Sequence, residues 1–467
     1  MLPGGDVCYA ALKARDPRFD GQFFVGVSST GIYCRPVCPA RTPRRRHCSF
    51  FPSAAAAEHG GFHPCLRCRP ELAPGNASVD ASHRLAQAVA ARIEDGCVTD
   101  ESLADVAADL GVTDRHLRRV FEAEFGVAPV EYLQTQRLLL AKRLLTDTGM
   151  PVTDVAMAAG FGSVRRFNAL FRGRYDMKPS DLRKSPGATS AAELVFELGF
   201  RPPFAWEALL EFLAGRTIDR VEAVDGGAYR RTVSIRHRTM QHVGWLAVDP
   251  VPRRNMLRVT LAGSLAGVVP PVLARVKRLF DLTCRPEEVA AHLGAMAEGE
   301  PGLRVPGAFD GFEMAVRAIL GQQITVRAAR TLAGRVAHAL GAPVSTPFPD
   351  IDLIFPEPEH VLAAGPQALV RLGVTGARAH AIQALARACH TGQVRLEPGG
   401  DVPRTMEMLR GLPGIGDWTA QYIAMRALSW PDAFPAADYG VKKALGETST
   451  ARVLARAEAW RPWRAYA

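Results

Sequence analysis

The 467-residue sequence has no uninterrupted apolar run near the roughly 18 residues that a membrane-spanning helix requires. Its first residues, 1–6, lack the basic and apolar regions of a secretory signal peptide. We therefore expect a cytoplasmic protein with no membrane partner.

A disulfide framework is also missing. The sequence contains nine cysteines, and a chain of this length does not need covalent cross-links to build a core. The cysteines that stand alone, without a recurring spacing, are predicted to be reduced thiols: Cys8, Cys48, Cys97, Cys284 and Cys389.

Acidic residues are fewer than basic ones, 47 Asp plus Glu against 57 Lys plus Arg, which gives a net charge of +10. An excess of positive charge favours a polyanionic partner such as nucleic acid. The length predicts about three domains.

The remaining four cysteines form a recognisable pattern. Cys34 and Cys38 form a Cys-x3-Cys pair, and Cys65 and Cys68 form a Cys-x2-Cys pair further along the chain. This spacing is typical of tetrahedral zinc sites with four thiolate ligands. The pattern predicts bound zinc, and a purely structural zinc site is one interpretation of it.

The residues around the two pairs, 30–41 and 61–68, closely resemble the zinc domain of the bacterial Ada adaptive-response family. The resemblance implies that Cys34 is both a zinc ligand and the acceptor of a methyl group from a DNA phosphotriester. Zinc keeps a cysteine deprotonated, and the thiolate is the nucleophilic form. The basic residues expected to hold flanking phosphates are Arg35, Arg41, Arg44, Arg45, Arg46 and Arg67.

Four thiolates around one zinc ion leave a net negative charge, which repels DNA phosphates but tolerates an uncharged phosphotriester. Methylation of Cys34 would remove one negative charge. The sequence thus suggests that methylation itself raises affinity for DNA.

Residues 82–184 show helical periodicity and a weak internal repeat, in which Asp105–Ala107 recurs as Asp154–Ala156. Each copy is followed by a glycine turn and a second helical pattern, and the segment resembles the double helix-turn-helix domain of AraC-type regulators. A helical bundle with solvated arginines is the alternative. The side chains expected to face DNA include Arg115, His116 and Arg119 in the first unit and Arg165 and Arg166 in the second.

After a predicted linker at residues 185–190, the Pro-Cys-His-Arg motif of a second Ada-type methyltransferase domain is absent. Strand-like and helical stretches alternate up to about residue 300, and helical patterns dominate beyond it. Leu412–Gly416 is typical of a helix-hairpin-helix turn, in which Gly414 and Gly416 let backbone amides approach a DNA phosphate.

The hairpin is followed by Trp418, Tyr422 and Asp438, and the sequence from about residue 194 onward resembles AlkA-type 3-methyladenine DNA glycosylases. The resemblance implies that Trp418, Tyr422 and Phe212 line a base pocket and that Asp438 stabilises the developing oxocarbenium ion. Beside the hairpin, Asp417 stands where bifunctional relatives carry a lysine, so a monofunctional enzyme is expected.

Two features depart from the family pattern. The intercalating wedge, commonly apolar, corresponds to Gln323, so Gln323 or the neighbouring Ile324 would fill the gap left by a flipped nucleotide. Relatives also supply a second pocket aromatic from residues beyond the position at which this sequence ends.

We therefore predict a multidomain α+β protein. Its expected parts are a small zinc-bound α/β domain at 1–75, an all-α double helix-turn-helix domain at 76–185, and an α+β glycosylase with a mixed subdomain at 186–300 and a helix-hairpin-helix subdomain at 301–467. The predicted partners are double-stranded DNA, both alkylated and promoter sequences, and RNA polymerase.

The leading functional hypothesis combines methyl transfer to Cys34, transcriptional activation and excision of alkylated bases. One alternative is a transcription regulator whose C-terminal part binds DNA without catalysis. Another is an active glycosylase that carries an inert zinc module for targeting.

Overall fold

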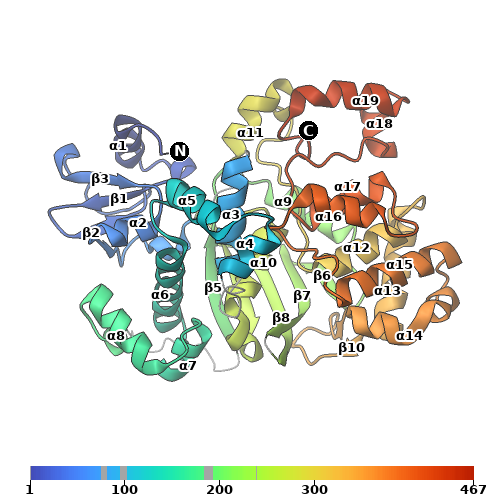
Figure 1. The fold of residues 1–467 in the computed structure, drawn as a ribbon, viewed down its shortest axis with the longest axis horizontal. Helices are drawn as coiled ribbons and strands as arrows, with labels where there is room; N and C mark the ends of the chain where they lie inside the picture. The colour runs from blue at the N-terminus through green and yellow to red at the C-terminus, as the bar shows by residue number, and fades with distance from the viewer. Residues whose placement is uncertain (1, 75–80, 95–102, 183–192, 238) are drawn as a thin grey trace.

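A computed structural model of the chain describes residues 2–74, 81–94, 103–182, 193–237 and 239–467 (Figure 1). Within these ranges, no helix combines the length and the apolar character needed to cross a membrane. The predicted linker at residues 185–190 lies outside the described residues.

The first part, which we call the cysteine module (residues 2–74), is built on a four-stranded sheet of order β3-β1-β2-β4. Strand β1 pairs antiparallel with β2 and β3, whereas β4 runs parallel to β2. Gly31, at φ 66°, turns the chain between β1 and β2, and Ser53 caps the helix that packs on the sheet. The elements are α1 (Gly5–Ala14), β1 (Phe24–Val27), β2 (Ile32–Cys34), β3 (Cys48–Phe51), α2 (Ala54–His59) and β4 (His63–Pro64).

The second part, the helix-turn-helix module, is helical as predicted over its described residues, 81–94 and 103–182. Its elements are α3 (Ala81–Glu94), α4 (Leu103–Asp109), α5 (Asp114–Phe125), α6 (Pro129–Asp147), α7 (Val152–Ala158), α8 (Val164–Tyr175) and the short 3-10 helix η5 (Pro179–Leu182).

The internal repeat is confirmed at the level of individual turns. Gly111 and Gly160, at φ 68° and 81°, separate α4 from α5 and α7 from α8. Thr113 and Ser163 cap the second helix of each unit by accepting from the backbone N–H three residues on. The second helices bury their apolar faces, as the periodicity predicts.

The third part, the C-terminal part (residues 193–467), begins with an antiparallel five-stranded sheet of order β5-β9-β8-β7-β6. Three helices accompany this sheet. The elements are β5 (Glu193–Gly199), α9 (Trp206–Ala214), β6 (Glu222–Asp225), β7 (Ala228–His237), β8 (Met240–Pro250), β9 (Met256–Ala262), α10 (Val269–Leu279) and α11 (Pro286–Leu293).

The chain then becomes mainly helical, with its own apolar core. A two-stranded ribbon, β10 (Ala342–Pro343) and β11 (Leu353–Ile354), is the exception in this segment. The helices are α12 (Gly311–Leu320), α13 (Val326–Leu340), α14 (Pro358–Arg371), α15 (Gly376–His390), α16 (Val402–Arg410), α17 (Asp417–Arg426), α18 (Tyr439–Leu445) and α19 (Thr450–Ala457).

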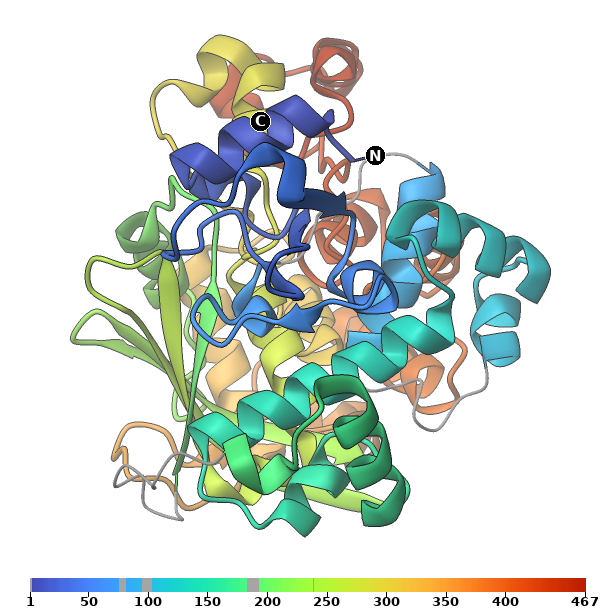
Figure 2. The same ribbon diagram turned by 90° about the vertical axis from the view of Figure 1, so that its left-hand side faces the viewer.

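The three parts pack closely against one another. A single apolar core runs from α6 and α8 into the five-stranded sheet, joining, for example, Leu144 and Phe171 to Phe196. Arg143 of α6 is buried, and its guanidinium carbon lies 4.9 Å from the centre of the Phe196 ring. An ion pair of 2.6 Å joins Arg18 to Glu287. Figure 2 shows the two N-terminal modules in front of the C-terminal part.

Candidate functional sites

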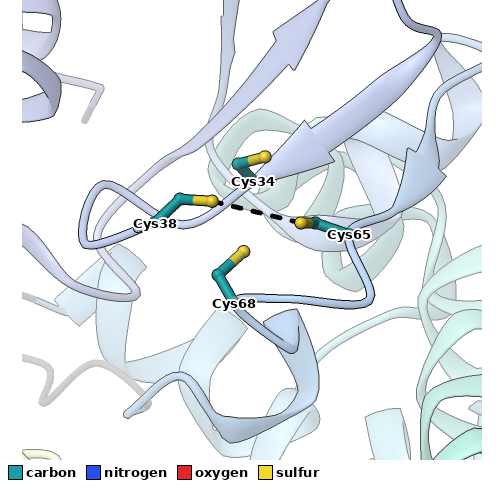
Figure 3. A group of neighbouring side chains, drawn as sticks. All are labelled: Cys34, Cys38, Cys65 and Cys68. Carbon is teal, nitrogen blue, oxygen red and sulfur yellow. Dashed lines mark hydrogen bonds between the residues drawn. The ribbon is translucent and has the colours of Figure 1, made fainter. Parts of the chain in front are cut away.

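The four paired cysteines come together at one end of the small sheet (Figure 3). Cys34 ends β2, and the parallel pairing of Tyr33 with Pro64 brings Cys65 beside it. All four Sγ atoms lie within 4.8 Å of one another, and those of Cys38 and Cys65 are 4.0 Å apart. Tetrahedral zinc with Zn–S bonds of about 2.3 Å requires sulfurs about 3.8 Å apart. The cluster therefore fits zinc in number, donor type and spacing.

The four sulfurs differ in accessibility. Cys38, Cys65 and Cys68 are buried, whereas Cys34 is half-buried. The Arg35 backbone N–H donates to Cys68 Sγ at 3.4 Å, and the Arg35 guanidinium donates to the Cys68 carbonyl at 3.1 Å. Among these four cysteines, Cys34 is thus the one that a reactant can approach most easily.

The arginines around the cluster do not share one environment. Arg41, Arg44, Arg46 and Arg67 are exposed, and Arg45 packs on Phe50 at 5.0 Å with its side chain 44% exposed. These positions can contact phosphates.

The interpretation of Arg35 as a phosphate contact is wrong, because its side chain is buried. Its guanidinium forms a two-point ion pair with the buried carboxylate of Asp20, with the Nε to Oδ1 distance at 2.8 Å. The role of Arg35 in this structure is to hold the loop that carries Cys68.

The second helices of the two helix-turn-helix units present basic residues to solvent. Arg115 and Arg119 on α5 and Arg165 and Arg166 on α8 are exposed. His116 is half-buried and lies 3.1 Å from an Arg119 guanidinium nitrogen. Both recognition helices therefore offer positive charge to a DNA groove.

The predicted hairpin joins α16 to α17. Gly414 has a φ of 76°, and a Cβ at this position would meet the Cβ of Ala381 at 2.9 Å, so the turn requires glycine. Gly416 begins α17 in an extended conformation with open space around it. The Gln322 side chain donates to the Gly414 carbonyl at 2.8 Å and fixes the hairpin against the loop that follows α12.

Trp418, Tyr422 and Asp438 meet at the same cavity, which has a volume of about 1000 Å³. The rings of Trp418 and Tyr422 stack with centroids 5.4 Å apart and planes 9° apart. The Trp418 indole N–H donates to Asp438 Oδ2 at 2.8 Å, while Asp438 Oδ1 accepts from the backbone N–H of Gly440 at 2.7 Å. Asp438 is a helix cap whose second oxygen faces the aromatic stack.

The loop between α12 and α13 separates the two wedge candidates. Gln323 is exposed at the cavity with a φ of 52°, whereas Ile324 packs against the helical core. Of the two, Gln323 is the side chain free to enter a DNA duplex.

Sequence reasoning missed several residues of this cavity. Tyr439 is 80% exposed at the edge of the cavity, and its place directly after Asp438 is a signal in the sequence that indicates it. Arg216, Arg317 and Arg426 also line the cavity and come from three separate segments of the chain. No spacing in the sequence predicts that they meet.

The three arginines add positive charge to the pocket, and against the opposing effect of burial they lower the pKa of the Tyr422 hydroxyl. Burial, the largest influence, raises the pKa of Tyr422, but the charges of Arg426, Arg317 and Arg216 outweigh it, so the pKa is lowered overall. Arg426 donates to the Tyr422 hydroxyl at 2.7 Å. Phe212 lies behind Arg216, whose guanidinium carbon is 3.7 Å from the centre of its ring.

Four family models match successive parts of the chain. They describe the metal binding domain of Ada (residues 7–71), a helix-turn-helix domain (106–185), the AlkA N-terminal domain (195–310) and the HhH-GPD superfamily of base excision DNA repair proteins (316–463). The fold and the two sites thus define a DNA-binding repair protein with a zinc domain and a base-excision domain.

Individual relatives extend this match to the whole chain. The "Probable bifunctional transcriptional activator/DNA repair enzyme AlkA" of Mycobacterium tuberculosis is 38% identical over 476 residues, which cover 98% of this chain and 94% of the relative. The chain belongs to this family of bifunctional activator and repair proteins.

Two further matches concern the C-terminal part. DNA-3-methyladenine glycosylase 2 of Escherichia coli is 38% identical over 273 residues, covering 58% of this chain and 95% of the relative. The solved structure of a 3-methyladenine DNA-glycosylase from Archaeoglobus fulgidus has a TM-score of 0.50 at 21% identity, covering 58% of this chain and 94% of that one. At that identity the structural match shows the fold alone.

Proposed function

We propose that this protein repairs alkylated DNA by two reactions and reports the damage as a transcriptional activator. One reaction transfers a methyl group from a DNA methylphosphotriester to Cys34. The other hydrolyses the glycosidic bond of alkylated bases such as 3-methyladenine. The main observation in favour of base excision is the hydrogen-bonded pair of Trp418 and Asp438, which lies at the wall of a cavity beside the proposed DNA-binding hairpin.

In the methyl transfer, Cys34, Cys38, Cys65 and Cys68 would hold zinc, which keeps the bound sulfurs as thiolates at neutral pH. The Cys34 thiolate attacks the methyl carbon, an S–C bond forms, and the C–O bond breaks. The electron pair leaves with the oxygen, so the triester becomes an ordinary charged phosphodiester. The half-buried position of Cys34 supports its assignment as the acceptor.

Methylation converts a thiolate to a neutral thioether and removes one negative charge from the metal centre. Arg41, Arg45 and Arg67 would then attract DNA phosphates with less opposition, and Arg115, His116, Arg119, Arg165 and Arg166 would contact the promoter. This change would raise promoter affinity most strongly at low salt. Activation implies contact with RNA polymerase in the cytoplasm.

In base excision, Gly414 and Gly416 would hold the DNA backbone while Gln323 occupies the gap left by the flipped nucleotide. Trp418 and Tyr422 would contribute the base-pocket wall, and Phe212 would support it from behind Arg216, which itself lines the cavity. As the glycosidic bond breaks, the Asp438 carboxylate would stabilise the positive charge on the sugar and orient the attacking water.

The full chain tests the proposal. Single-turnover release of 3-methyladenine from methylated duplex DNA checks base excision, and intact-protein mass after incubation with methylphosphotriester DNA checks methyl transfer. Absence of base release would favour a C-terminal part that only binds DNA, and absence of methyl uptake would favour an inert zinc module.

A further inference from the structure

The cavity beside Cys34 has walls from two modules. It has a volume of about 610 Å³, and the cysteine module contributes apolar side chains such as Val27 and Ile32. The opposite wall comes from the end of the helix-turn-helix module and includes Met177 and Leu182. Both of these residues are partly buried and pack on the apolar core that the module shares with the five-stranded sheet.

The second wall continues directly from a DNA-reading element. Helix α8, the recognition helix of the second unit, ends at Tyr175, and the chain then runs through Met177 into η5. The wall is therefore covalently continuous with the C-terminal end of the recognition helix.

Hydrogen bonds and an ion pair to a buried carboxylate join this wall to the cysteine module. Glu58 of α2 is 3% exposed and accepts from the Tyr33 hydroxyl at 3.0 Å and from the Tyr175 hydroxyl at 3.4 Å. Arg174 lies 3.6 Å from the second carboxylate oxygen of Glu58. Tyr33 immediately precedes Cys34, so this carboxylate joins the acceptor strand to the end of α8.

A second contact lies close to the metal centre. His63, two residues before Cys65, donates from Nδ1 to the Arg174 carbonyl at 2.8 Å. The acceptor strand, the loop before Cys65 and the end of α8 are thus held as one unit.

We propose that Met177 and Leu182 form an alkyl-binding subsite that completes the methyl-acceptor site. Before transfer, the subsite takes the methyl group of the uncharged phosphotriester, because an apolar wall tolerates a neutral ester better than a charged phosphodiester. After transfer, the S-methyl group of Cys34 packs against the same wall and holds the end of α8 in place. This inference rests on the proposed methyl transfer and adds an apolar contribution to the charge switch.

The size of the effect follows from burial of one methyl group. Burying a single carbon of this kind contributes about 0.8 kcal/mol, which corresponds to about fourfold in an equilibrium or a rate. A polar side chain at position 177 should remove most of that contribution.

The test uses the full-length protein with zinc bound and a duplex that carries one methylphosphotriester. Met177→Gln should take up methyl about fourfold more slowly than wild type at subsaturating DNA, and Met177→Leu should restore the rate. Met157→Gln is the matched control, since Met157 lies in the same module and is 53% exposed. Leu182→Gln provides a second variant in case Met177→Gln loses its zinc or its helical content.

Hydrogen exchange supplies a readout that does not depend on the reaction rate. In wild type, methylation of Cys34 should slow amide exchange in residues 175–182, and in fully methylated Met177→Gln this slowing should be lost.

Suppose that the wild-type chain takes up methyl and that Met177→Gln and Leu182→Gln show the same uptake rate and the same amide exchange as wild type. This result would overturn the subsite and leave the proposed function intact. Equal losses in Met177→Gln and Met157→Gln would also overturn it. Failure of the wild-type chain to take up methyl would overturn both the subsite and the proposed methyl transfer.

Discussion

Replacing Asp438 with Asn tests the assignment of the base-excision site. The substitution keeps the shape of the side chain, and Asn Oδ1 can still cap α18 through Gly440. The amide nitrogen then replaces the oxygen that accepts from the Trp418 indole N–H at 2.8 Å, so two donors face each other. The variant therefore loses both the negative charge and one hydrogen bond inside the cavity.

The expected magnitudes differ for stability and rate. Loss of one hydrogen bond to a charged, half-buried acceptor should cost about 1.5 kcal/mol of unfolding free energy. Loss of an electrostatic contact to the transition state should slow the chemical step by about 10²-fold or more. A stability loss of this size leaves the protein folded, so a rate deficit of about 10²-fold would identify a catalytic role for the carboxylate.

The assay is single-turnover release of 3-methyladenine from methylated duplex, with binding to an abasic-site mimic measured alongside. Binding should change little, because the proposed contact of Gly414 and Gly416 with the DNA backbone does not involve Asp438. Asp401→Asn is the matched control, since Asp401 also caps a helix, α16, and does not line the cavity. Wild-type release by Asp438→Asn, or an equal deficit in Asp401→Asn, would exclude a catalytic role for the Asp438 carboxylate.

Further predictions concern the aromatic stack, the metal centre and the buried carboxylate between the modules. Trp418→Ala should slow release of cationic alkylbases more than release of neutral ones, because it removes a cation–π contact worth up to about 2 kcal/mol; equal losses for both classes would contradict this. Cys34→Ala should abolish methyl uptake and weaken zinc retention, measured by mass and metal content, whereas Cys48→Ala should do neither. Removing zinc with a chelator should lower the melting temperature, and an unchanged melting curve would argue against a structural contribution of the metal. Burial raises the pKa of Glu58 to about 7, with Arg174 as the charge that opposes the shift, so this group contributes stability below its unfolded pKa that is lost as pH rises through about 7. The stability of wild type relative to Glu58→Gln should therefore fall by roughly 3 kcal/mol between about pH 5 and about pH 8, and a constant difference in melting would contradict the shift.

The sequence predicts those parts of the fold that depend on residues close together in the chain. Local spacing correctly predicts the two cysteine pairs, the glycine turns at Gly111 and Gly160, and the hairpin at Gly414. In each case a short segment meets a strict requirement, either a ligand geometry or a positive φ, that few residue types satisfy.

Contacts between distant segments could not be predicted in this way. The position of Arg35 beside a predicted ligand indicates a phosphate contact, whereas in the fold its charge is neutralised by Asp20 from another loop. The arginines at the base cavity come from α12, α17 and the segment after α9, and nothing in the local sequence indicates that they converge.

The shared core between the modules is a further example. Helix α6 buries residues around most of its circumference, including the consecutive Ala141–Leu145, and its leucine-rich sequence indicates burial without indicating the partner. The partner is the five-stranded sheet of the C-terminal part. For this reason the repair and regulatory activities are best measured on the full chain.

If one chain both accepts a methyl group on Cys34 and excises alkylated bases, both products should form in a single reaction. This can be measured by incubating the protein with DNA that carries both lesions, weighing the intact protein and collecting the released bases. We expect a mass gain of one methyl group located at Cys34, together with free 3-methyladenine. An unchanged protein mass, a methyl group on another residue, or a reaction without released base would contradict this expectation.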